Sequence, residues 1–151
     1  MNEKKRSLMA SVEDNISKDW ESFVRHIAER HRAGRSDREI GSELGQMSVH
    51  WSGVVSETQL EDGQLVAIAV KMSHAEIQMD GGYVFQGAHL SLPVRRSKCR
   101  DRCRFLREGQ PITFAATLAS NEGVFTTVWT MKDDEERKVI LRLSLESAEI
   151  H

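Results

Sequence analysis

The sequence predicts an α+β fold, mainly β, in which helices come first and a β domain follows. Two observations support this prediction. Apolar residues recur at helical spacing near the N-terminus, and from residue 49 onward they alternate with a period of two in runs rich in β-branched and aromatic residues. We therefore divide the chain into an N-terminal tail with a helical extension, 1–46, and a β domain, 47–151.

Composition places the chain among ordinary globular proteins. It has 39% hydrophobic and 29% charged residues, a mean hydropathy of -0.47 and a formal net charge of -2. No apolar run approaches the roughly 20 residues of a membrane span, and the charged start lacks the apolar stretch of a secretory signal. We therefore expect a cytoplasmic protein with no membrane partner.

The helical extension is predicted to contain two helices. The first has five apolar residues on one face: Ile16, Trp20, Phe23, Val24 and Ile27. The run 31–35 breaks it, and Ser36 and Glu39 then match a capping box, in which each side chain accepts from the other's free backbone N–H. A short second helix is expected to reach Leu44 and end at Gly45, because glycine readily adopts the left-handed conformation.

The β domain is predicted to contain six strands separated by turn signals. They are 49–56, 64–72, 83–92, 111–119, 124–131 and 138–147. The residues expected to face inward are Val66, Ile68, Val70, Met72, Val84, Ala88, Leu90, Leu92, Ile112, Phe114, Ala116, Leu118, Val139, Leu141, Leu143 and Leu145. Between the third and fourth strands, Ser97 to Arg107 is predicted to form a helix, which Gly109 and Pro111 end.

This order, together with three local phrases, resembles the OB-fold of the anticodon-binding-like kind. Val49 to Val55 resembles its glycine-bearing first strand, 105–114 its entry to the fourth strand, and 140–150 its closing strand. The resemblance covers about residues 47 to 150. It implies a small Greek-key β-barrel with one helix between strands 3 and 4. The hairpin at 124–131 exceeds the usual five strands, and it either extends or caps the barrel.

Basic residues are concentrated in the predicted helix. The segment 95–107 holds seven basic residues and one acidic residue, whereas 39–94 contains only Lys71 as a lysine or arginine. On a helix, four arginines fall within an arc of about 80°: Arg96, Arg100, Arg104 and Arg107. Such a stripe is suited to phosphate groups, because the arginine fork matches their oxygens. A solvated helix face is the alternative.

Two aromatic residues are predicted to lie on the strand face opposite the core. Tyr83 and Phe85 alternate with Val84, and OB-folds that bind single strands present aromatic rings for base stacking. Ordinary packing is the alternative interpretation. The acidic residues of 57–63 are expected to repel phosphates.

Motifs for chemistry are missing from the sequence. No metal-ligand spacing, nucleophile elbow or phosphate-binding glycine loop occurs, so we predict no metal, no cofactor and no enzymatic activity. Cys99 and Cys103 are four residues apart and are expected to pack the predicted helix on the barrel.

The sequence thus predicts a non-catalytic binding module for single-stranded nucleic acid or a nucleoprotein. One alternative is a protein-interaction module, such as an adaptor, inhibitor or immunity-type protein, whose basic helix meets an acidic partner and whose N-terminal helix docks. A second alternative is a helix-turn-helix reader, because 36–45 resembles its second helix and turn. That reading requires 48–56 to be a recognition helix, although its residues favour a strand.

Overall fold

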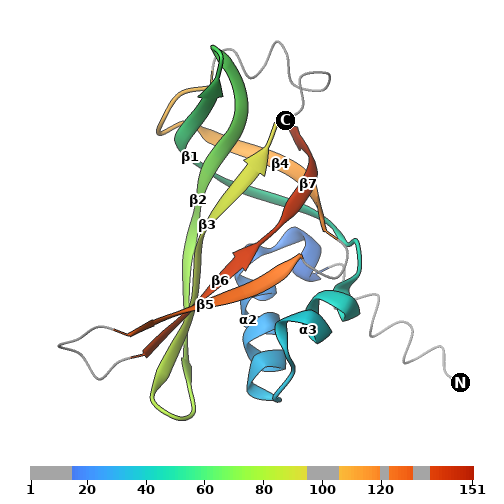
Figure 1. Cartoon of the computed structure of the whole chain (residues 1–151), viewed down its shortest axis with the longest axis vertical. Coiled ribbons are helices and arrows are strands. Elements are labelled where there is room, and N and C mark those ends of the chain that lie inside the picture. Colours follow the sequence, from blue (N-terminus) through green and yellow to red (C-terminus); the bar gives the residue numbers. More distant parts are fainter. Residues whose placement is uncertain (1–14, 95–105, 120–122, 131–136) are drawn as a thin grey trace, which may run out of the picture.

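The computed structural model describes residues 15–94, 106–119, 123–130 and 137–151. Two helices come first, α2 (Trp20–Arg32) and α3 (Asp37–Leu44). The described strands are β1 (Ser48–Glu61), β2 (Gln64–Met79), β3 (Tyr83–Pro93), β4 (Pro111–Leu118), β5 (Val124–Thr130), β6 (Arg137–Leu143) and β7 (Leu145–Ile150). Figure 1 shows a tall curled sheet with both helices against its lower half. The predicted mainly-β class with N-terminal helices is confirmed.

The helical extension has the predicted form. All five residues of the predicted apolar face are buried. The Glu39 N–H donates to Ser36 Oγ (3.2 Å) and the Ser36 N–H donates to Glu39 Oε1 (3.3 Å), which confirms the capping box. Gly45 ends α3 with a φ of 60°. Because β1 follows three residues later, no recognition helix succeeds α3, and the helix-turn-helix interpretation is wrong. Within the described residues, no helix is long and apolar enough to cross a membrane.

The strands form one sheet in the order β5-β6-β3-β2-β1-β4-β7. β1 bends across it: the N-terminal half pairs with β4, and the part from Val54 onward pairs with β2. Gly53 lies at this change of partner, where an added Cβ would come within 2.5 Å of Val70 Cγ1. The glycine therefore permits the close crossing that curls the sheet.

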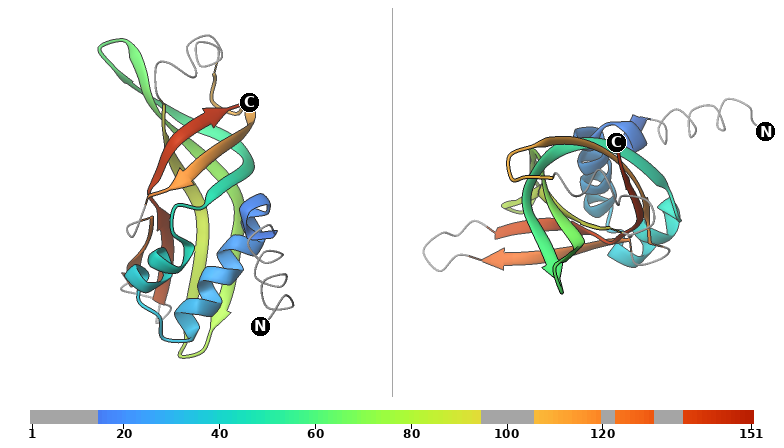
Figure 2. Two further views of the ribbon diagram at one scale, coloured as in Figure 1. Left: turned by 90° about the vertical axis from the view of Figure 1, so that its right-hand side faces the viewer. Right: turned by 90° about the horizontal axis from the view of Figure 1, so that it is seen from above.

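The sheet curls back on itself because β6 and β7, on opposite sides of it, are consecutive in the chain. Only Ser144 separates them, yet β6 pairs with β3 and β7 pairs with β4. An isolated parallel bridge pairs Val94, just after β3, with Ala148 of β7. It continues the register of the parallel β3–β6 pairing, in which Tyr83 lies opposite Arg137. The sheet is consequently a half-barrel, and the view from above shows it curling round (Figure 2).

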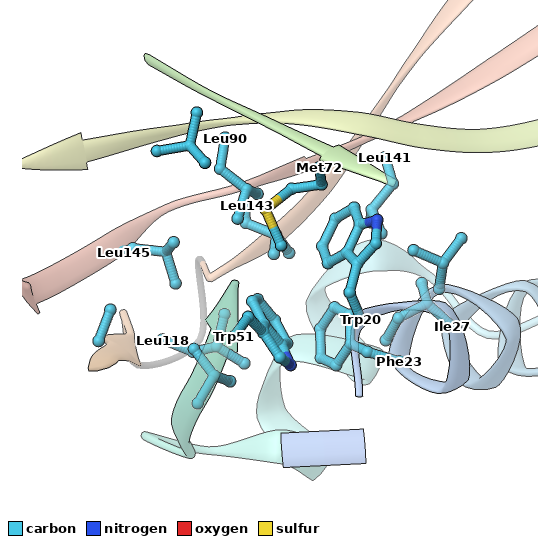
Figure 3. Packing of buried hydrophobic residues seen from close by; sticks show 14 of the residues in the cluster. Trp20, Phe23, Ile27, Trp51, Met72, Leu90, Leu118, Leu141, Leu143 and Leu145 are labelled. Atoms are coloured by element: carbon cyan, nitrogen blue, oxygen red, sulfur yellow. The ribbon is translucent and has the colours of Figure 1, made fainter. Parts of the chain in front are cut away.

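One core extends through both the helices and the sheet. Trp20 and Phe23 of α2 contact Trp51 of β1, with ring centroids 5.1 and 4.9 Å apart, and Trp51 in turn contacts Phe114 of β4 (6.4 Å). Figure 3 shows the helix side chains and those of the sheet interior meeting at Trp51. The apolar face of α2 is therefore buried in the core of this chain. It is not available as the docking surface that the protein-interaction alternative requires.

The connection between β3 and β4 is only partly described. Most of the predicted helix 97–107, including both cysteines, lies outside the described residues. Its last two residues, Leu106 and Arg107, are not helical, and no helix occurs among the described residues between these strands. A helix between strands 3 and 4 is therefore not found in the described structure.

Several strands are longer than predicted. β1 continues to Glu61, so the predicted connection 57–63 is mostly strand, and the turn is formed by Asp62 and Gly63, both with positive φ. β2 continues to Met79 through an irregularity at which 72–74 lie opposite a single residue of β3. The indole N–H of Trp20 donates to the Ser73 carbonyl there (2.9 Å), which satisfies a backbone group that the irregular pairing leaves free.

Candidate functional site

A shallow hollow lies on the outer face of three neighbouring strands. It has a volume of about 270 Å³ and is lined by Glu57, Gln59, Ala67, Ala69 and Ser91. Cross-strand pairing places these residues together, because Glu57 lies opposite Ala69 and Ala69 lies opposite Ser91. The short side chains of the two alanines lie at the bottom of the hollow, between longer polar side chains. Alternation explains why the hollow faces outward, since Ile68, between the alanines, is buried in the core.

The basic segment begins and ends beside this hollow. At its start, the Val94 N–H donates to the Val66 carbonyl (3.0 Å). At its end, the Gly109 N–H donates to the Val55 carbonyl (2.7 Å), and the Val55 N–H donates to the Gln110 carbonyl (2.9 Å). Val94 is three positions after Ser91 of β3, and Val55 is two positions before Glu57 of β1. Ser91 and Glu57 both line the hollow. The fold therefore fixes the main chain on both sides of the most basic segment within a few residues of the hollow.

One arginine of the predicted stripe is described. Arg107 is exposed, and its backbone N–H donates to Gln110 Oε1 (3.2 Å), which fixes the main chain just before β4. Arg96, Arg100 and Arg104 lie outside the described residues, so their arrangement as a stripe stays a prediction.

For Phe85 of β3, the packing interpretation is correct and the exposed stacking face is not found. Phe85 is fully buried at 0% exposure, with its ring centroid 5.6 Å from that of His31 in α2. Tyr83 is half-buried, and its hydroxyl lies 3.1 Å from His31 Nδ1. Both rings pack between β3 and α2, so Phe85 offers no surface for base stacking.

The error arose because strict alternation was assumed along β3. Phe85 and Gly87 face α2, whereas Leu90 and Leu92 face the barrel interior, so the inward side changes phase between them. The phase change lies opposite the irregular stretch 72–74 of β2. A single strand sequence does not reveal an irregularity in its partner, so this change could not be predicted from 83–92 alone.

Ionic contacts among the described residues are concentrated on the helices, away from the hollow. The Arg30 Nε–H donates to Glu43 Oε2 (2.9 Å), joining α2 to α3, and this hydrogen bond lowers the pKa of Glu43. Burial lowers the pKa of His26, and the nearby Arg30 charge lowers it further. Within the described part of the chain, no group of three or more histidine, cysteine or acidic side chains could hold a metal ion.

Sequence reasoning missed two surface features. The first is the hollow, whose signal was the outward pair of alanines within an apolar strand. The second is a set of exposed large hydrophobic residues: Val54, Leu60, Phe125 and Val128. Of these, Phe125 and Val128 lie on β5. This strand is additional to the usual five of the OB-fold.

No protein-family model matches the sequence, and no curated protein matches it. Among solved structures, the crystal structure of the mitochondrial single-stranded DNA binding protein Rim1 from S. cerevisiae is similar, with a TM-score of 0.30 and 12% identity. The match covers 68% of this chain and 90% of that chain.

Proposed function

We propose that the protein is a non-catalytic, OB-like binding module that contacts single-stranded nucleic acid through the outer face of its half-barrel. The observation that carries the proposal is the anchoring of both ends of the basic segment beside the hollow lined by Glu57, Ala69 and Ser91. A strand lying across this face would meet polar groups and the arginines of 95–107 together. The anticodon-binding-like resemblance supports the same class of partner.

Charge provides the main attraction in the proposed complex. Arg96, Arg100, Arg104 and Arg107 neutralise phosphates and release condensed counterions, which makes affinity depend on salt. The hollow supplies hydrogen-bonding groups for a base. Glu57 repels phosphates and limits where the backbone can lie.

A charge-reversal pair tests the proposal. In R100E/R104E, binding of fluorescein-labelled single-stranded DNA and RNA, measured by anisotropy, is expected to weaken at least tenfold. The matched control is R25E/R38E, which makes the same change in net charge at exposed positions on the helices. Circular dichroism verifies folding. Equal binding by R100E/R104E and the parent, or equal losses in both pairs, would overturn the proposed interface.

One observation favours a protein partner as the second candidate. Leu60 is 63% exposed near the tip of the β1–β2 hairpin, beside the exposed acidic residues Glu61 and Asp62. An apolar side chain among carboxylates suits a basic protein surface better than a nucleic acid. A pull-down with and without nuclease separates the two functions. A protein captured equally after nuclease treatment, and lost in the variant Leu60→Ser, would favour this second function.

A further inference from the structure

The outer face of β5 and β6 is distinct from the hollow, which β1, β2 and β3 form. Val139, Leu141 and Leu143 of β6 are buried in the core, so the alternate residues lie on the opposite face. Phe125 of β5 lies opposite Arg142, and residues opposed in an antiparallel pair share a face. Both helices lie against the other face, as Figure 1 shows, so this one is uncovered by them.

Phe125 is held on this face although it gains little from burial. Its side chain is 43% exposed, whereas its neighbour Val124 is 2% exposed and faces the core. The strand itself is fixed from the core side, because the Thr126 N–H donates to Asp37 Oδ2 (3.0 Å) and the Thr126 hydroxyl lies 3.0 Å from the same oxygen. Phe125 is thus a positioned, accessible aromatic ring.

Among the described residues of this face, the charged side chains are basic. β5 and β6 contain no acidic residue, and on this face β6 carries Lys138 and Arg142, with the half-buried Ile140 between them. The two basic residues are four positions apart on one strand, a span of about 13 Å at the usual rise per residue. Within the described residues, neither of them makes an ion pair. Their charges are therefore free to attract an anionic ligand.

We propose that this face is a second contact for single-stranded nucleic acid, in which Phe125 stacks on a base while Arg142 and Lys138 hold the flanking phosphates. This inference depends on the proposed function and extends it by naming a surface outside the hollow. Exposed aromatic rings beside cationic side chains are the combination that binds single strands without sequence preference, because every base has a π-face. Because Lys138 and Arg142, the described charged residues of this face, are both basic, an anionic polymer suits it better than a basic protein.

Substitution of the ring tests the stacking contact. We expect F125A and F125L to weaken binding of labelled oligothymidylate about 5- to 100-fold in anisotropy titrations, and F125Y to retain parental affinity, because only tyrosine keeps the aromatic face. V128A is the matched control. It removes an apolar side chain that is more exposed than Phe125, from the same strand but from the core-side face, opposite Val139.

The outcomes separate this inference from the proposed function. If the parent fails to bind single-stranded DNA or RNA, both fail. If the parent binds and R100E/R104E weakens binding while F125A, F125L and the pair K138E/R142E bind like V128A, only the second contact is overturned. The inference is supported if F125L and K138E/R142E each lose affinity, V128A does not, and thermal melts show all variants folded.

Discussion

Substitution of Gly53 by alanine tests the bend that forms the half-barrel. A Cβ at this position would lie 2.5 Å from Val70 Cγ1, 2.8 Å from Met72 Sδ and 3.0 Å from the Lys71 carbonyl oxygen. Overpacking of this kind costs about 1–3 kcal/mol, and alanine recovers about 0.4–1 kcal/mol through the unfolded state. We expect a net loss of about 1–2 kcal/mol in the free energy of unfolding, or roughly 2–8 °C in Tm for a chain of this size.

A double-mutant cycle isolates the clash. The variant Val70→Ala leaves a cavity in the parent, but in the Gly53→Ala background it also makes room for the new methyl group. The loss in free energy of unfolding caused by Val70→Ala, measured by urea denaturation, is therefore expected to be about 1 kcal/mol smaller in the Gly53→Ala background than in the parent. If Gly53→Ala were as stable as the parent, or if the two substitutions were additive, the close crossing of β1 over β2 would not determine the bend.

Three further predictions concern the helices. Asp37→Ala removes both acceptors for Thr126 and is expected to lower the free energy of unfolding by about 2 kcal/mol in urea denaturation, with Asp37→Asn intermediate because it keeps one oxygen. Ser36→Ala breaks the capping box with Glu39, and we expect a loss of about 1 kcal/mol, read from thermal melts. Burial holds the pKa of His26 below 6.5, so the unfolded chain binds more protons. Stability is expected to fall as pH decreases from above 6.5 through the lowered pKa, and in His26→Gln part of this dependence should disappear.

Much of the fold was predictable because local chemistry determined it. The apolar face of α2, the capping box of α3 and the inward residues of β4 each depend on a few neighbouring positions, and the structure confirms all three. Gly53 is the glycine of the first strand in the OB-fold resemblance, and the structure places it where β1 closely approaches β2.

The candidate site was less predictable because it depends on contacts between distant segments. Alternation along β3 predicts that Phe85 is exposed, but α2 packs on that side of β3 and the irregular stretch of β2 changes the phase. The described end of the basic segment lies near the hollow because Val55 pairs with Gln110, more than fifty residues away, and no local pattern indicates this pairing. Phe125 was assigned to a strand, but its exposure depends on which face the helices cover.

The most direct measurement is the salt dependence of single-stranded DNA binding by the parent and by R100Q/R104Q. Each phosphate neutralised on a single strand contributes about -0.7 to the slope of log K against log salt, so contact by all four arginines predicts a slope near -2.8 or steeper. Removal of two charges is expected to make the slope shallower by about 1.4. A parental slope near zero, or the same slope in both proteins, would contradict the assignment of these arginines to a phosphate backbone.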